Sequence, residues 1–152
     1  MKSEVKIEDN RLQMTRVFDA PASVLFGFFS TADKLQRWSG CKETTHCEVQ
    51  MDFRVGGSFT QKMQIEGAGE FTFTGTYDEI VVPKKIAYHA DFGQFTAKIV
   101  VEFIEQDGRT KVVLTQDGFP DEFHCKTVSQ GTTESWEKLA QLLSAGSLAS
   151  NA

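Results

Sequence analysis

The segment Gly-Cys-Lys-Glu-Thr-Thr-His-Cys at residues 40–47 holds the densest group of potentially reactive side chains in the sequence. It brings Cys41, His46 and Cys47 close together along the chain, and His124-Cys125 adds a second histidine–cysteine pair downstream. Thiolate and imidazole groups are common zinc ligands, and two neighbouring thiols can also form a redox pair. Either chemistry requires a fold that brings these side chains into contact.

The expected positions of these side chains argue against a shared metal ion. The alternation that follows predicts a strand with Cys47 on its covered face, so His46 should face solvent, because neighbouring strand residues point to opposite sides. Cys41 and Cys47 are also farther apart in sequence than the roughly two to four intervening residues typical of zinc ligands. We expect no metal site and no cofactor. The segment is interpreted as a connection that rims a cavity, in which Cys41 and Cys47 remain free to approach each other.

Other titratable side chains also lack an arrangement suited to catalysis. The strand register places His89 on the outer face, and His124 lies in a loop or at the start of the last helix, within reach of a cavity mouth. No nucleophile motif, phosphate-binding loop or dinucleotide fingerprint is present. The carboxylates of the central region all fall on the polar register: Glu48, Asp52, Glu70, Asp78 and Glu102. We therefore predict no catalytic residue.

Composition and charge restrict the class of protein. The chain has 152 residues, which favours a single domain spanning 1–152, and its net charge is −5, which disfavours nucleic acid or an anionic membrane surface as a partner. No apolar run approaches the roughly 18 residues of a membrane helix, and no secretory signal is visible, so a cytoplasmic protein with reduced thiols is expected. The 13 phenylalanines indicate either a thick core or an apolar cavity.

Hydrophobic periodicity predicts an α+β fold. Alternation over about 45–117 indicates a six-stranded antiparallel meander, with a tight hairpin turn at Gly56-Gly57 and a first strand near 12–18. Residues 1–10 form either a ragged strand or a loose leader. Helical spacing predicts one helix over 21–30 and a second, short helix that Thr31 caps and Gly40 ends. It predicts a third helix over about 129–144, for which an earlier start is also compatible with the pattern. The core is expected at 11–144 and a mobile tail at 145–152.

The covered face of the predicted sheet has the composition of a small-molecule pocket. It is mostly apolar and carries a few hydrogen-bonding groups, namely Gln61, Tyr77, Tyr88 and Gln116. A filled core would show a similar pattern, so both interpretations stand at this point. The candidate ligand-binding residues are Trp38, Met51, Phe53, Phe59, Gln61, Met63, Phe71, Phe73, Tyr77, Tyr88, Phe103, Gln116 and Trp136.

Six motifs occur in an order that resembles a known family. They are TRVFDAP at 15–21, the spacing from it to Trp38, DFRVGGSF at 52–59, GTYDEIVVPKKIAYH at 75–89, DGRTKVVLTQDGFP at 107–120 and SWEKLAQLL at 135–143. The chain resembles the START-like (SRPBCC) superfamily and, within it, the activator of heat-shock protein 90 ATPase homologue family. It departs from the family pattern at Trp38-Ser39, Val82-Pro83 and Ser135-Trp136.

The resemblance implies a helix-grip fold, in which a curved antiparallel sheet wraps around a long C-terminal helix and two short helices follow the first strand. It also implies a cavity between sheet and helix, so we favour binding of a small apolar or aromatic molecule without assigned catalysis. One alternative is a chaperone-associated regulator of a heat-shock protein 90-type ATPase, with the chaperone as partner. Another is an enzyme acting on an apolar ligand. The sequence does not indicate an oligomeric state.

Overall fold

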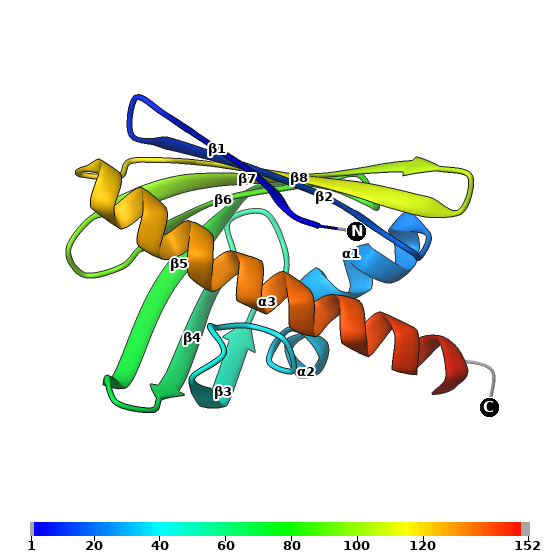
Figure 1. The fold of residues 1–152 in the computed structure, drawn as a ribbon, viewed down its shortest axis with the longest axis horizontal. Coiled ribbons are helices and arrows are strands. Elements are labelled where there is room, and N and C mark those ends of the chain that lie inside the picture. Colours follow the sequence, from blue (N-terminus) through cyan, green and yellow to red (C-terminus); the bar gives the residue numbers. More distant parts are fainter. Residues whose placement is uncertain (1, 150–152) are drawn as a thin grey trace.

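The computed structural model describes residues 2–149, with side chains described through residue 144. Two strands and two short helices open the chain, a run of six strands follows, and a long helix ends it (Figure 1). In order, the elements are β1 Glu4–Glu8, β2 Arg11–Phe18, α1 Ala22–Ser30, α2 Ala32–Leu35, β3 Thr44–Met51, β4 Ser58–Ile65, β5 Gly69–Val81, β6 Lys85–Asp91, β7 Thr96–Gln106, β8 Arg109–Asp117 and α3 Glu122–Ala149.

The eight strands form one antiparallel sheet in the order β1-β2-β8-β7-β6-β5-β4-β3. The predicted meander is therefore confirmed as β3 to β8. Of the two structures considered for residues 1–10, a strand or a loose leader, residues 4–8 form the strand. Because β2 pairs with β8, the chain must then cross to the opposite edge before β3, and α1 and α2 make that crossing. Figure 1 shows the sheet bending between its two ends while α3 runs across the concave side.

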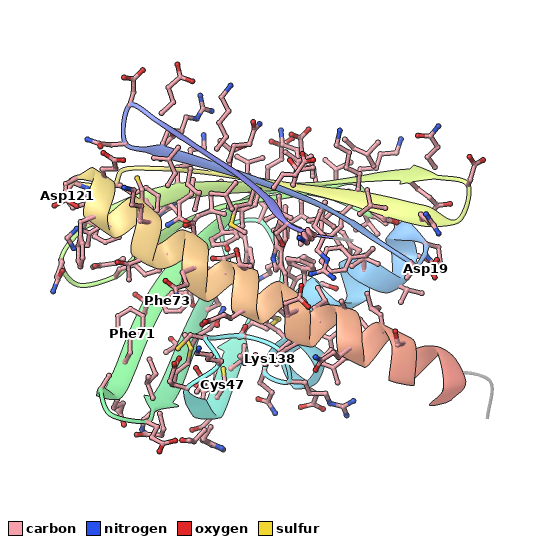
Figure 2. The ribbon with its side chains drawn as sticks, viewed as in Figure 1. Asp19, Cys47, Phe71, Phe73, Asp121 and Lys138 are labelled. Carbon is pink, nitrogen blue, oxygen red and sulfur yellow. The ribbon has the colours of Figure 1, made fainter. Side chains whose placement is uncertain are left out.

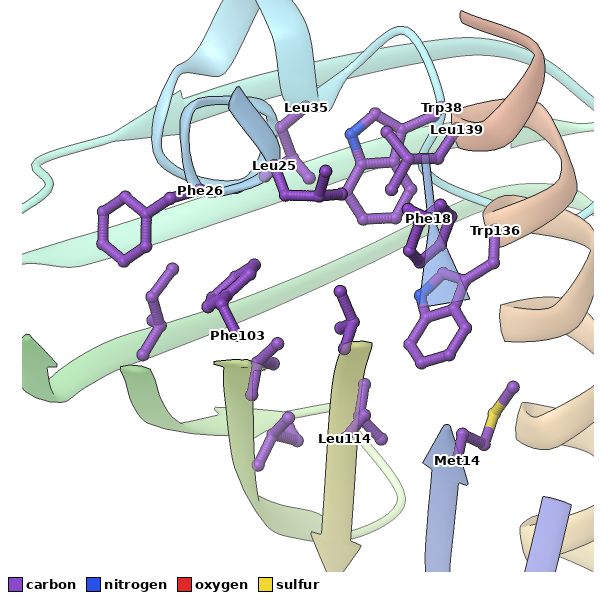
Figure 3. Packing of buried hydrophobic residues seen from close by; sticks show 14 of the residues in the cluster. Met14, Phe18, Leu25, Phe26, Leu35, Trp38, Phe103, Leu114, Trp136 and Leu139 are labelled. Atoms are coloured by element: carbon purple, nitrogen blue, oxygen red, sulfur yellow. The ribbon is translucent and has the colours of Figure 1, made fainter. Parts of the chain in front are cut away.

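The core lies where α3 meets β2 and the short helices. Trp136, Leu139 and Leu143 recur at helical spacing on α3 and are buried against Met14 and Phe18 of β2 (Figure 3). The Trp136 and Phe18 rings meet edge to face, with centroids 5.8 Å apart. This seam anchors α3 to one end of the sheet.

Helix α3 is longer than the sequence analysis predicted. It begins at Glu122 because Asp121 caps it: the Asp121 carboxylate accepts the backbone N–H of His124 at 2.9 Å. It continues through Ala149 and so extends into residues 145–152, which were predicted to form a mobile tail; the mobility of that segment stays a prediction. The last part of that predicted tail, residues 150–152, lies outside the described residues.

The connection between β3 and β4 contains the predicted turn, closed by the Gly57 N–H donating to the Arg54 carbonyl at 2.8 Å, but the whole connection is longer than a tight hairpin. It spans residues 52–57, and its Gly56 N–H donates to the Tyr77 carbonyl of β5, so the loop folds onto the sheet. Gly57 is required here because a Cβ would come within 2.0 Å of the Asp52 carbonyl. Since the strand ends at Met51, the alternation fails beyond it and Val55 is 59% exposed.

The two short helices begin without a hydrogen bond from an N-cap side chain. Pro21 occupies the N-cap of α1, and the Ala22 N–H is accepted by the distant Glu105 carboxylate at 2.7 Å. Thr31 occupies the N-cap of α2, but its side chain makes no capping bond there, contrary to expectation. After α2 the Trp38 indole donates to the Phe28 carbonyl at 3.1 Å, and Gly40 adopts a φ of +91°, which favours glycine.

Replacement of Leu139 by alanine should weaken the helix-to-sheet seam. Leu139 is fully buried, and truncation of such a side chain costs roughly 2–5 kcal/mol because a cavity replaces it. Denaturant unfolding measures this loss. Gln141→Ala, an exposed position on the same helix, is the matched control and should change stability by less than about 0.5 kcal/mol. Equal effects of the two substitutions would contradict this account of the core.

Candidate functional site

A cavity of about 500 Å³ lies between the concave face of the sheet and α3. Within the described residues, the α3 backbone approaches β1 and β2 and no other strand, so the helix stands away from the β4–β6 half of the sheet. Figure 2 shows Phe71 and Phe73 of β5 in this space beside α3. The loop after α2 and the loop between β6 and β7 supply the remaining walls.

One cross-strand row of side chains carries three of the polar groups that line the cavity. Gln116 of β8 pairs with Ile99 of β7, Ile99 with Tyr88 of β6, and Tyr88 with Tyr77 of β5. All four side chains line the cavity, because residues directly opposite in a sheet point to the same face. The strand alternation seen in the sequence therefore produces a mostly apolar wall with an amide at one end and phenols at the other.

A continuous series of aromatic rings runs along the same wall toward the start of α3. Ring centroids are 5.2 Å apart for Tyr77 and Phe59, 6.1 Å for Phe59 and Phe73, 4.9 Å for Phe73 and Phe92, and 5.3 Å for Phe92 and Phe95. We call these five residues the aromatic arc. The glycine opposite Phe59, Gly75, makes the arc possible, because a Cβ there would lie 2.5 Å from the Phe59 ring.

The structure places ten of the thirteen candidate residues around the cavity: Trp38, Phe59, Gln61, Met63, Phe71, Phe73, Tyr77, Tyr88, Gln116 and Trp136. The other three, Met51, Phe53 and Phe103, do not line it. Phe103 and Phe53 instead contact Phe26 of α1, with centroids 5.4 and 5.9 Å apart, so these rings fill the space beneath that helix. Met51 is half-buried at the end of β3.

Further lining residues were not among the candidates, and most of them lie on loops and helices. Phe92, Gln94 and Phe95 come from the β6–β7 loop, where no alternation marks the inner face. The others are Phe29, Leu35, Ser39, Gly40, Cys41, Ile65, Ile86, Ile99, Val101, Leu114, His124, Thr127, Val128, Gly131, Thr132 and Ser135. The apolar side chains Ile99, Val101 and Leu114 share the predicted covered face, which was the one available signal.

The cavity wall has little charge. No Lys, Arg, Asp or Glu occurs among the described residues that line it. Burial raises the pKa of Tyr88 to about 12, and burial together with the neighbouring Tyr88 raises the pKa of Tyr77 above its ordinary value. Both phenols are therefore neutral hydrogen-bonding groups over the physiological pH range.

His124 is the histidine at the cavity mouth. Its Nδ1 lies 2.7 Å from Asp121 Oδ1, and its Nε2 lies 3.2 Å from Gln94 Oε1. The same contacts lower the pKa of the Asp121 carboxyl, chiefly through the His124 backbone N–H. With both ring nitrogens engaged, His124 connects the first turn of α3 to the β6–β7 loop.

The segment 40–47 attaches its loop to α3. Ser135 Oγ donates to the Gly40 carbonyl at 2.7 Å, and the Lys42 N–H donates to Glu134 Oε1 at 3.1 Å. His46 is exposed and Cys47 is half-buried, as the register predicted. Lys138 Nζ donates to the carbonyls of Ser39 and Cys41, at 3.2 and 3.4 Å.

The Cys47 thiol is not activated. Burial raises the pKa of the Cys47 thiol, and the nearby Lys138 only partly opposes that shift (Figure 2). The Cys41 thiol and the Glu43 and Glu134 carboxylates have ligand atoms within 4.8 Å of one another. Glu134 already accepts the Lys42 N–H, which explains its position without a metal ion.

The sequence profile of the family described as Activator of Hsp90 ATPase homolog 1-like protein matches residues 19–144. The chain belongs to this family. No curated protein matches the sequence. The match covers the segments that build the cavity, from α1 through most of α3.

Solved structures with the same fold come from several bacteria. A protein from Chromobacterium violaceum superposes with a TM-score of 0.82 at 23% identity, over 89% of this chain and 97% of that one. A protein from Mycobacterium smegmatis superposes with a TM-score of 0.80 at 19% identity, over 94% of this chain and 98% of that one. A protein from Arthrobacter aurescens superposes with a TM-score of 0.82 at 16% identity, over 95% of this chain and 92% of that one. These likenesses establish the helix-grip fold. None of the helices over 2–149 has the length and hydropathy needed to cross a membrane.

The tyrosines give a direct test of the neutral cavity wall. The chain has two, and both line the cavity. The unfolded chain should ionise both near pH 10, whereas the native protein should ionise neither there. Because the unfolded state loses its protons first, stability is fully present below pH 10 and should fall as the pH rises toward 12. Tyrosinate absorbance of native and denatured protein measures this difference, and Tyr88→Phe should halve the amplitude. Ionisation near pH 10 in the native protein would contradict the burial of these phenols.

Proposed function

We propose that this protein binds a small apolar or aromatic molecule in the cavity between the sheet and α3. The observation that carries the proposal is the aromatic arc facing about 500 Å³ of unfilled space. Volumes in this range suit small-molecule ligands, and ring faces without a packing partner lose dispersion contacts that a ligand would restore. Family membership supports a binding or regulatory role in general.

Binding without assigned catalysis is the form of the proposal that the lining supports best. No carboxylate or amine lines the cavity among the described residues, and the ring nitrogens of His124 are engaged by Asp121 and Gln94. General acid–base work requires a positioned group of suitable pKa within reach of the substrate. An enzyme acting on an apolar ligand would have to use His124 or one of the two neutral tyrosines for this work.

Gly131 offers a way to block the cavity without loosening the fold. It lies on α3 and lines the cavity, and a Cβ there would meet only the Cys41 Cβ, at 3.9 Å. Gly131→Leu should extend a side chain into the cavity and raise the melting temperature, since leucine favours a helix by roughly 0.8 kcal/mol over glycine. We expect binding of the neutral dye 1-aminoanthracene to weaken at least about tenfold because leucine occupies ligand volume.

Dye binding can be followed by energy transfer from tryptophan. The chain has two tryptophans, Trp38 and Trp136, and both line the cavity. Gln130→Leu, which adds the same side chain to the exposed neighbouring position, is the matched control and should bind the dye like wild type. Absence of dye binding to wild type, or undiminished binding to Gly131→Leu, would count against the proposal.

The family description favours a second candidate, a regulator of an Hsp90-type ATPase. If the protein acts in this way, adding it to a purified Hsp90-type chaperone should raise the rate of ATP hydrolysis with a saturable dependence on its concentration. Steady-state ATPase measurements test this, with heat-denatured protein as the control. A rate that does not change at saturating protein would remove this candidate and leave ligand binding unaffected.

A further inference from the structure

Gln116 carries an unsatisfied hydrogen-bond donor in the wall of the cavity. Its side chain is 4% exposed, yet it lines the cavity, and its Nε2 has no hydrogen-bond partner among the described residues. Buried amide donors are nearly always paired, because leaving one unpaired costs the full desolvation of the group. The donor therefore indicates an acceptor that the protein itself does not supply.

The neighbours of Gln116 in the sheet explain why no side chain meets this donor. Its cross-strand partners are Leu12 on β2 and Ile99 on β7, and both are aliphatic. The next inward residue along β8, Leu114, is aliphatic as well. With apolar side chains on these three sides, the amide can find an acceptor only from the direction of the cavity.

The charge of the cavity restricts the chemistry of that acceptor. No Lys or Arg lines the cavity among the described residues, so a bound carboxylate or phosphate would be buried without a counter-charge, which is costly. A neutral oxygen avoids this cost. Tyr88 lies two strands from Gln116 in the same row, about 10 Å away by strand spacing, and leaves room for a ring system between them.

We propose that the ligand is a neutral, ring-bearing carbonyl compound. Its carbonyl oxygen accepts the hydrogen bond from Gln116 Nε2, and its rings lie against Phe59 and Phe73 of the aromatic arc. This inference rests on the proposed binding function and adds the chemical class and orientation of the ligand. It also gives Gln116 a role that an apolar residue at this position could not perform.

Two probes of matched shape test this proposal: the ketone 2-propionylnaphthalene and the hydrocarbon 2-propylnaphthalene. Quenching of Trp38 and Trp136 fluorescence gives the dissociation constant of each probe. Wild type should bind the ketone about tenfold more tightly than the hydrocarbon, as one buried hydrogen bond provides. Gln116→Leu should weaken ketone binding about tenfold and leave hydrocarbon binding equal or tighter, because only the donor is removed.

A spectroscopic measurement and two further variants make the test specific to Gln116. The infrared band of a carbon-13 carbonyl in the ketone should shift to lower frequency on binding to wild type and should lose this shift in Gln116→Leu. Gln13→Leu makes the same change on the exposed outer face of the adjacent strand and should behave like wild type. Loss of the ketone preference in Gln61→Leu but not in Gln116→Leu would overturn the assignment to Gln116.

The possible failures are distinguishable. If both probes bind wild type equally and Gln116→Leu leaves their ratio unchanged, the carbonyl inference is wrong while the binding function stands. If neither probe binds wild type, the binding function fails and the inference fails with it. Gln116→Leu should have a melting temperature no lower than that of wild type, because an apolar side chain replaces an unpaired buried amide. The melting temperature therefore also shows that the variant is folded when its binding is compared with wild type. A lower melting temperature would contradict the unpaired donor.

Discussion

The mismatch between one helix and a curved eight-stranded sheet is the constraint on which the rest of this structure depends. Eight strands at about 4.8 Å spacing span roughly 34 Å, whereas a helix with its side chains is about 10 Å across. Helix α3 can therefore bury its apolar stripe against only one part of the sheet, and it does so at β2 through Trp136 and Leu139. The other half of the sheet curves away from α3, and its inner face must be covered by loops and short helices. The cavity is the space that this incomplete coverage leaves.

The sequence predicted the inner face of the sheet well because alternation records the direction in which each side chain points. The register alone placed Gln61, Tyr77, Tyr88 and Gln116 inward, and all four line the cavity. Alternation does not record which element covers a given part of that face, so Phe53 and Phe103 were assigned to the cavity although α1 covers them. Loop residues such as Phe92, Gln94 and Phe95 carry no periodic signal, and their contribution depends on tertiary contacts that a single sequence does not reveal. The start of α3 at Glu122 could have been predicted from the sequence, because Asp121 is a residue type that commonly caps helices.

Residues 40–47, the segment with the greatest density of thiol and imidazole groups, hold a loop against α3. Its backbone carbonyls and amides, rather than its cysteines, make the contacts with Ser135, Glu134 and Lys138 that hold the loop against α3. Residue type alone was a poor guide here, since the chemistry of a side chain matters only where the fold gives it a partner. The same reasoning applies to the family: membership fixes the helix-grip fold, whereas the chemistry of the cavity depends on the side chains that this particular chain projects into it.

The row from Gln116 to Tyr77 also bears on how such proteins diverge. Each residue in the row contributes its side chain to the cavity and its backbone to the sheet, and these two contributions are physically independent. An exchange of side chains along the row can therefore change the shape and polarity of the cavity while every ladder hydrogen bond persists. A sheet built in this way can keep its architecture while the lining of its inner surface differs. Proteins that share only 16–23% of their residues with this chain still superpose on it with TM-scores near 0.8.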